Sequence, residues 1–248
     1  MDQRKIVLSF LFLANFCALG QKSTNDDFVV IAKKFLGRPY QGHMLSSGNP
    51  ERLITSQEAF DCVTFIEHSL ATKISNADPN KWVSALKHVR YAGDSVQFEK
   101  RYHYFSDAMR NLGFSLIQDP KHHSIATKDF SFLSNYLKDK GDKTVNIGLL
   151  AMREGQLKAE KFEYTSIKDL PFLLPLIQDG DLIGLVGKKD HLDFLHTAIA
   201  VKKGTQVHLL HASQEKKKVI VSDETLTDYL KSHRQFIGIS VFRPKFSL

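Results

Sequence analysis

The sequence contains very few cysteines: of its 248 residues, only Cys17 and Cys62. This scarcity excludes a disulfide-stabilised scaffold and a zinc cluster built on several thiols. Internal repeats, low-complexity tracts and phosphate-binding glycine loops are also missing from the sequence. What is present, 42% hydrophobic and 25% charged residues, is typical of a globular chain. The net charge of +7 is too small to indicate nucleic-acid binding.

The N-terminal segment has the pattern of a secretory signal peptide. Two basic residues precede an apolar run at residues 6–19, which as a helix would span ~21 Å, less than the ~30 Å hydrocarbon core of a bilayer. Small residues then offer a cleavage point before Gln21. We therefore predict that residues 1–20 are removed and that 21–248 form one domain, exported to the periplasm or secreted. Stable membrane insertion after cleavage is not expected. An uncleaved N-terminal anchor is the alternative.

Apolar residues at helical spacing dominate the first half of the mature chain. They predict one helix that starts at Asn25 and ends at Gly37, a second from Asp61 to Asn76, and a third that begins at Asp78 with a proline next to it. The pattern from 91 to 161 is mixed. Within this region, helices are expected near 98–111 and 129–139.

Short β-rich runs replace the helical pattern after residue 171. They are separated by turn signals and predict strands at 181–187, 197–201, 207–212, 218–221 and 236–242. Ser222 is expected to cap a brief helix between the last two. Helices first and an antiparallel sheet later predict a single-domain α+β fold.

Cys62 is the one cysteine of the predicted mature chain, and it lies in the first turn of the second predicted helix. The positive end of a helix dipole and its free N–H groups favour a thiolate at this position. Two interpretations are open from position alone: a reactive thiol, or a small buried residue of a core helix. A nucleophilic cysteine needs a base, usually histidine, and that base needs an orienting group.

Two of the eleven histidines fall in a predicted β-hairpin, residues 195–213. A two-residue loop at Lys203 and Gly204 would place His196 directly opposite His211 on one face, with Cβ atoms ~5 Å apart. His208 has the other parity and should point away. This register would supply a base and an orienter side by side, and the alternative is two unrelated strand histidines.

Five separated motifs then occur in a characteristic order. They are 37–40 (GRPY), 60–67 (FDCVTFIE), 101–105 (RYHYF), 192–199 (LDFLHTAI) and 211–213 (HAS). Together they resemble the NlpC-type cell-wall cysteine hydrolases, and more closely the branch described as N-acetylmuramoyl-L-alanine amidase-like. The resemblance runs from about residue 27 to the C-terminus. The general pattern has Asp-Cys-Ser-Gly at the nucleophile, whereas this chain has Asp-Cys-Val-Thr, which fits the amidase-like branch.

The resemblance implies a papain-like α+β fold, in which a helix bearing the cysteine packs on an antiparallel sheet bearing both histidines, with helical additions. It implies that Cys62 is the nucleophile, His196 the general base and His211 the orienter. It also implies that Tyr40, together with the backbone N–H of Cys62, stabilises the oxyanion. Neither metal nor cofactor is expected. The implied substrate is peptidoglycan or a muropeptide, cleaved at the amide between N-acetylmuramic acid and L-alanine.

Four further residues match positions specific to the branch and are predicted substrate contacts: Arg101, His103, Tyr104 and Asp193. An ion pair for Arg101, a core position for Tyr104 and a turn position for Asp193 are the structural alternatives. Two alternative functions remain. One is a γ-D-glutamyl-diaminopimelate endopeptidase with the same mechanism, and the other is a non-catalytic cell-wall-binding module.

Overall fold

A computed structural model describes residues 24–45, 50–158 and 161–246, so the predicted signal peptide and Cys17 lie outside the described residues. The helices are α1 (Thr24–Lys33), α2 (Cys62–Ile74), α3 (Pro79–Arg90), η1 (Ala92–Asp94), η2 (Phe98–Lys100), α4 (Phe105–Asn111), α5 (Phe132–Asp139), α6 (Ile147–Lys158), α7 (Leu170–Leu173), η3 (Leu174–Leu176) and α8 (Leu226–Ser232). The strands are β1 (Ser115–Ile117), β2 (Ser124–Ala126), β3 (Phe162–Ser166), β4 (Leu182–Gly187), β5 (His196–Lys203), β6 (Gln206–Ser213), β7 (Lys218–Val221) and β8 (Phe236–Arg243).

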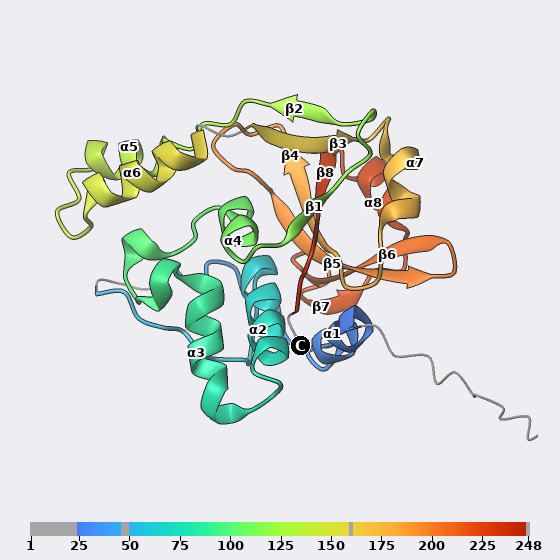
Figure 1. Ribbon diagram of the computed structural model, residues 1–248, viewed down its shortest axis with the longest axis horizontal. Helices are drawn as coiled ribbons and strands as arrows, with labels where there is room; N and C mark the ends of the chain where they lie inside the picture. The colour runs from blue at the N-terminus through green and yellow to red at the C-terminus, as the bar shows by residue number, and fades with distance from the viewer. Residues whose placement is uncertain (1–23, 46–49, 159–160, 247–248) are drawn as a thin grey trace, which may run out of the picture.

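The strands of the described residues form one eight-stranded sheet (Figure 1). Its order is β2-β3-β8-β4-β5-β6-β7, with β1 paired to β8 beside β3. Every pairing between these strands is antiparallel. The predicted combination of helices with an antiparallel sheet is therefore confirmed.

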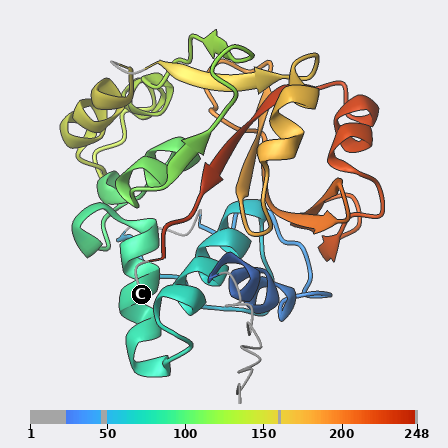
Figure 2. The ribbon, with the colours of Figure 1, turned by 45° about the vertical axis from the view of Figure 1, so that its right-hand side comes forward.

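Both faces of the sheet are covered by helices (Figure 2). Strand β4 shows the division, because its buried side chains alternate between two cores. Leu182 and Val186 belong to the core that includes residues of α1, α2 and α4. Ile183 and Leu185 belong to the core formed with α7 and α8. Side chains on one face of β5 and β6 therefore pack toward α2, and those on the other face pack toward α8.

Local signals placed the helices next to the site correctly. Asp61 caps α2, and Asp78 caps α3, where Pro79 occupies the first turn. The five predicted strands correspond to β4 through β8. The predicted cap at Ser222 is wrong. Thr225 caps α8 instead, while the Ser222 hydroxyl donates to the carbonyl of Glu224.

The elements of the mixed region were harder to predict, and α6 and β1 to β3 were missed. In α6 the buried positions Leu150, Glu154 and Leu157 have helical spacing, but a glutamate interrupts the apolar stripe. Its carboxylate accepts hydrogen bonds from the Tyr104 hydroxyl and from backbone N–H groups of α5. Those partners come from other parts of the chain, so a pattern of apolar spacing could not reveal this buried position.

Candidate functional site

Cys62 is the first residue of α2, and a capping box holds the turn around it. The Asp61 carboxylate accepts from the Thr64 N–H at 2.8 Å, and the Asp61 N–H donates to the Thr64 hydroxyl at 2.9 Å. The second Asp61 oxygen accepts from the Met44 N–H at 3.3 Å. The Asp-Cys-Val-Thr motif is thus a capping box, with Thr64 supplying the return bond. This box does not use the N–H of Cys62, which lies at the positive end of the helix dipole.

A hydrogen bond joins Cys62 to the strand that carries the first histidine. The Thr197 hydroxyl donates to the Cys62 carbonyl at 2.9 Å. Thr197 follows His196 in β5, so the start of α2 is held beside the start of that strand. Within the described residues, no hydrogen bond joins the Cys62 thiol to the His196 ring. Catalytic contacts of this kind are often long without substrate.

The thiol of Cys62 is neutral in this environment. Burial, followed by the nearby Asp61 carboxylate, raises its pKa to about 11. Hydrogen bonding by Thr197 acts in the opposite direction but is the smaller effect. The helix position alone predicted a favoured thiolate, and this expectation is not met, because desolvation of the charged form outweighs the dipole. Attack by Cys62 would therefore require a base to remove the thiol proton.

His196 and His211 are in direct hydrogen-bond contact. The Nε2 of His196 lies 2.6 Å from the Nδ1 of His211, and the two rings meet edge to face. Burial lowers the pKa of His196 to about 3 and that of His211 to about 4. Each ring is therefore neutral near pH 7, with one ring nitrogen unprotonated. The Nδ1 of His196 is the ring nitrogen that remains for a thiol proton.

The register that produces this contact differs from the predicted one by two residues. Ile199 pairs with Leu210, so His196 and His211 are diagonal neighbours on one face rather than directly opposed. The loop is Gly204 and Thr205, not Lys203 and Gly204, and Lys203 pairs with Gln206. Favoured two-residue loops need a positive φ at their first position, and Gly204 supplies it with φ 63°.

A shift of two residues preserves parity, which explains why the face assignment is nevertheless correct. His211 shares its face with Leu209, in the core next to α8. The ring of Tyr229 from α8 meets the His211 ring edge to face, with centroids 5.7 Å apart. His208 points to neither ring of the pair, and its Nδ1 lies 3.0 Å from the Ser222 carbonyl. The alternative of two unrelated strand histidines is therefore wrong.

Tyr40 lies close enough to Cys62 to be affected by its charge. Its segment is held between Phe60, two residues before α2, and the edge of the sheet: the Tyr40 N–H donates to the Lys217 carbonyl, and the Phe60 N–H donates to the Pro39 carbonyl. Burial raises the pKa of Tyr40, and the adjacent Cys62 and Asp61 raise it further. The phenol stays protonated and can donate a hydrogen bond near the thiol.

Arg101 and His103 have partners inside the protein. Arg101 forms an ion pair with Glu51 at 2.8 Å, with 11% and 5% of the two side chains exposed, and also donates to the Leu45 carbonyl. His103 is bonded through Nε2 to the Phe98 carbonyl at 2.8 Å. Burial and the charge of Arg101 lower the pKa of His103 to about 3.

Tyr104 and Asp193 are buried. The Tyr104 hydroxyl donates to Glu154 at 2.9 Å. Asp193 accepts from the N–H groups of Ser106 and Phe194 at 2.7 and 2.8 Å. These contacts give both residues a structural role. Direct contact of Arg101, His103, Tyr104 or Asp193 with substrate stays a prediction.

Sequence reasoning missed two residues of the site, Thr197 and Tyr229. Strand parity places Thr197 on the face opposite His196, and only the structure shows that this is the face packed on α2. Tyr229 forms part of the apolar stripe of a short helix, so its sequence carries no signal beyond core packing. Its position against His211, and its electrostatic coupling to Cys62, come from the packing of α8 on the sheet.

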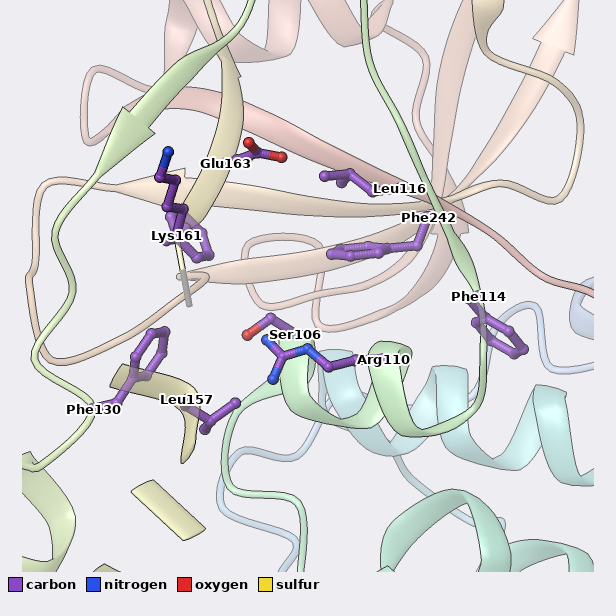
Figure 3. A pocket seen from close by; sticks show the side chains of 10 residues that line it. Ser106, Arg110, Phe114, Leu116, Phe130, Leu157, Lys161, Glu163 and Phe242 are labelled. Carbon is purple, nitrogen blue, oxygen red and sulfur yellow. The ribbon is translucent and has the colours of Figure 1, made fainter. Parts of the chain in front are cut away.

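A cavity of about 210 Å³ lies away from these residues, between α4 and strands β1, β3 and β8 (Figure 3). The side chains of Ser106 and Arg110 point into it among aromatic rings. Its lining includes none of Cys62, His196 and His211. Charges of both signs, Lys161 and Glu163 among them, surround it and select no single ligand.

Two observations bear on other chemistry. In the part of the chain that the structure describes, no cluster of three or more His, Cys, Asp or Glu side chains is arranged to hold a metal ion. None of the described helices has the length and apolar character needed to cross a bilayer.

Comparisons with known proteins give one family match and several similar solved structures. A family model described as AmiA-like, N-acetylmuramoyl-L-alanine amidase-like, matches residues 30–239. A solved N-acetylmuramoyl-L-alanine amidase from Bacteroides uniformis has a TM-score of 0.79 and 26% identity, covering 90% of this chain and 99% of its own. A putative xylanase from Bacteroides fragilis has a TM-score of 0.75 and 27% identity, covering 86% and 99%. A Legionella pneumophila protein matched by the DUF1460 family model has a TM-score of 0.64 and 19% identity, covering 90% of this chain and 91% of its own. At this identity the likeness shows the fold alone. No curated protein matches the chain significantly.

Proposed function

The chain belongs to the N-acetylmuramoyl-L-alanine amidase-like family, and on this basis we propose that it is a cysteine amidase acting on peptidoglycan fragments. The bond cleaved is the amide between the lactyl group of N-acetylmuramic acid and L-alanine. The family match and an amidase-named structure that aligns over 90% of the chain support the substrate class. The hydrogen-bonded His196–His211 pair next to the strand residue that binds Cys62 supports the mechanism.

The proposed reaction has two steps. In the first, the thiol proton of Cys62 moves to Nδ1 of His196 while sulfur attacks the carbonyl carbon. The Cys62 N–H and the Tyr40 hydroxyl stabilise the oxyanion, and His196 then protonates the departing amine of L-alanine. In the second, water attacks the thioester, gives its proton to His196 and releases the muramic acid carboxylate with the free thiol. No step uses a metal or cofactor.

We further propose that the fold is of the papain-like, NlpC type. Helix α2 carries Cys62 at its start and packs on β5 and β6, which carry the two histidines. The protein is proposed to be exported, as a periplasmic or secreted enzyme. Fractionation with N-terminal sequencing of the mature protein tests this, and a chain recovered in the cytoplasm with an intact Met1 would contradict it.

Digestion of a defined muropeptide tests the function. The wild type should release a peptide that begins with L-alanine, as read by mass spectrometry, and Cys62→Ala and His196→Ala should each abolish release. His88→Ala is the matched control, because His88 is exposed and its ion pair is with Asp94, away from the site. Full activity in Cys62→Ala, or loss of wild-type activity with a chelator, would contradict the mechanism.

The same digestion separates the alternative functions. Release of a dipeptide would identify the γ-D-glutamyl-diaminopimelate endopeptidase. Binding of wall fragments without cleavage would identify a non-catalytic module. One observation favours that module: the raised pKa of Cys62, which leaves no thiolate at rest. The pairing of His196 with His211 argues against it, since wall binding alone does not require two hydrogen-bonded histidines next to the strand residue that binds Cys62.

A further inference from the structure

The hydrogen bond between His196 and His211 holds one proton, and the position of that proton decides whether His196 can act as a base. To accept a proton at Nδ1, a neutral His196 must carry its own proton on Nε2. The Nε2 then donates to the Nδ1 of His211, 2.6 Å away. His211 must in turn carry its proton on its own Nε2. The tautomer of the second ring is therefore linked to the basicity of the first.

The Nε2 of His211 needs an acceptor in this arrangement. His211 is 1% exposed, and its Nε2 has no hydrogen-bond partner within the described residues. A buried N–H without a partner is unfavourable. Left unpaired, it would favour the opposite arrangement, in which His211 donates to His196 and the proton of His196 lies on Nδ1. That arrangement cannot remove the thiol proton.

A cavity of about 130 Å³ adjoins His211 and is large enough for a bridging water. Three acidic residues, Glu215, Asp223 and Glu224, share its lining with His211 and Tyr229. Glu224 already accepts a hydrogen bond from the Ser232 hydroxyl at 3.3 Å.

Glu215 has the neighbours that keep a carboxylate ionised. It lies 3.3 Å from the Lys216 ammonium and 3.7 Å from the Nε2 of His233. Burial and the nearby His233 lower the pKa of His211, and the negative charge of Glu215 raises it. His233 stacks on the Tyr229 ring, which in turn meets the His211 ring edge to face. Glu215 is thus the acid of the cavity with an electrostatic effect on His211.

We propose that Glu215 is a positioning residue for the histidine pair. Its carboxylate accepts the Nε2 proton of His211, directly or through one water, and so holds both rings in the tautomer that leaves Nδ1 of His196 free. Glu215 takes up no proton during the cycle. The inference rests on the proposed function, because it assigns the base to His196.

The tautomers can be read without any assay of activity. Long-range proton–nitrogen NMR spectra of the histidine rings at pH 7 should show both His196 and His211 protonated on Nε2 in the wild type. In Glu215→Ala the proton of His211 should move partly to Nδ1. A wild-type His211 protonated on Nδ1 would overturn the proposal.

Kinetics on the muropeptide provide the second readout. Glu215→Ala should lower kcat about tenfold with KM unchanged. Glu215→Gln should retain more than half of the wild-type kcat, because its amide oxygen still accepts a hydrogen bond. Glu224→Ala, a change in the same cavity, is the control and should leave kcat unchanged. An unchanged kcat in Glu215→Ala, or equal losses in the Ala and Gln variants, would overturn the proposal.

His233 needs its own control, since it also contacts Glu215. In a His233→Gln background, Glu215→Ala should still lower kcat about tenfold. Disappearance of the effect would show that Glu215 acts only through His233 and would overturn the proposal. If the wild type shows the predicted tautomers but cleaves no muropeptide, the proposed function fails and the positioning role of Glu215 stands.

Discussion

His196 contacts His211 across a diagonal of the β5–β6 ladder, Nε2 to Nδ1 at 2.6 Å, and not as a directly opposed pair. The diagonal arrangement lets the second ring lie beyond the first, toward Tyr229 and α8. His211 can therefore hold the Nε2 side of the His196 ring while the Nδ1 side stays free for the thiol. Four predictions follow from this site and the packing around it.

Removal of the orienting ring should impair chemistry more than folding. We expect His211→Ala to lower kcat by roughly 10²–10⁴-fold, because His196 loses the partner that selects its tautomer. The control is His208→Leu on the same strand, which faces away from the pair. It should lower the unfolding temperature but not the kcat of the folded enzyme. Equal kcat values in the two variants would contradict the assigned orientation.

The hydrogen bond from Thr197 to the Cys62 carbonyl should position the nucleophile. Thr197→Val preserves the shape of the side chain but removes the donor. We expect kcat to fall by about 10- to 100-fold, since small displacements of a reacting group are costly. Thr197→Ser keeps the hydroxyl and should recover most of the activity. Steady-state kinetics on a muropeptide measure this, and wild-type kcat in Thr197→Val would show that the bond is dispensable.

The buried ion pair between Arg90 and Glu67 should stabilise the packing of α3 on the nucleophile-bearing helix. Its atoms lie 2.8 Å apart, with 0% and 8% of the side chains exposed. Glu67→Leu should cost about 3–5 kcal/mol in the free energy of unfolding, because Arg90 is left buried and unpaired. Urea denaturation measures this free energy.

The exposed pair of Arg38 and Glu58 is the matched control, with 45% and 82% of its side chains exposed. Glu58→Leu should change the free energy of unfolding by less than about 1 kcal/mol. Similar decreases in the free energy of unfolding for Glu67→Leu and Glu58→Leu would mean that burial does not decide how much these ion pairs contribute to stability.

His68 should make the protein less stable in acid. Burial, and then the charge of Arg90, lowers its pKa from 6.5 to about 3. As pH falls below 6.5, the unfolded chain therefore takes up the proton before the folded one, and stability is lost until pH approaches 3. Because pH 5 lies about 1.5 units below the ordinary pKa of 6.5, the loss of stability at pH 5 is roughly 2 kcal/mol, at ~1.36 kcal/mol per unit.

His68→Gln removes this titration. The decrease in unfolding free energy between pH 7 and pH 5 should be about 2 kcal/mol smaller in the variant than in the wild type. Urea denaturation at the two pH values provides the comparison. His88→Gln, a substitution of an exposed histidine, is the control variant. An identical pH dependence in His68→Gln and wild type would show that His68 is not buried as a neutral ring.

Much of the fold next to the site could be predicted because its signals are local. Asp61 and Asp78 cap their helices by bonding N–H groups within three residues, and β7 begins and ends where its β-rich run does. Alternation along β5 and β6 likewise placed His196 and His211 on one face, since parity survives an error of two residues in register. These features depend on residues that are neighbours in the sequence.

Tertiary structure decided the features that depend on distant partners. The register was set by the φ that Gly204 can adopt, and the burial of Glu154 by donors from Tyr104 and α5. The protonation of Cys62 shows the same division. Its place at a helix start was evident from the sequence and favours a thiolate, whereas the desolvation that keeps the thiol neutral arises only when α2 packs against β5. Local hydrogen bonds are determined by residues close together in the sequence, whereas the dielectric surroundings of a charge are determined by the tertiary packing.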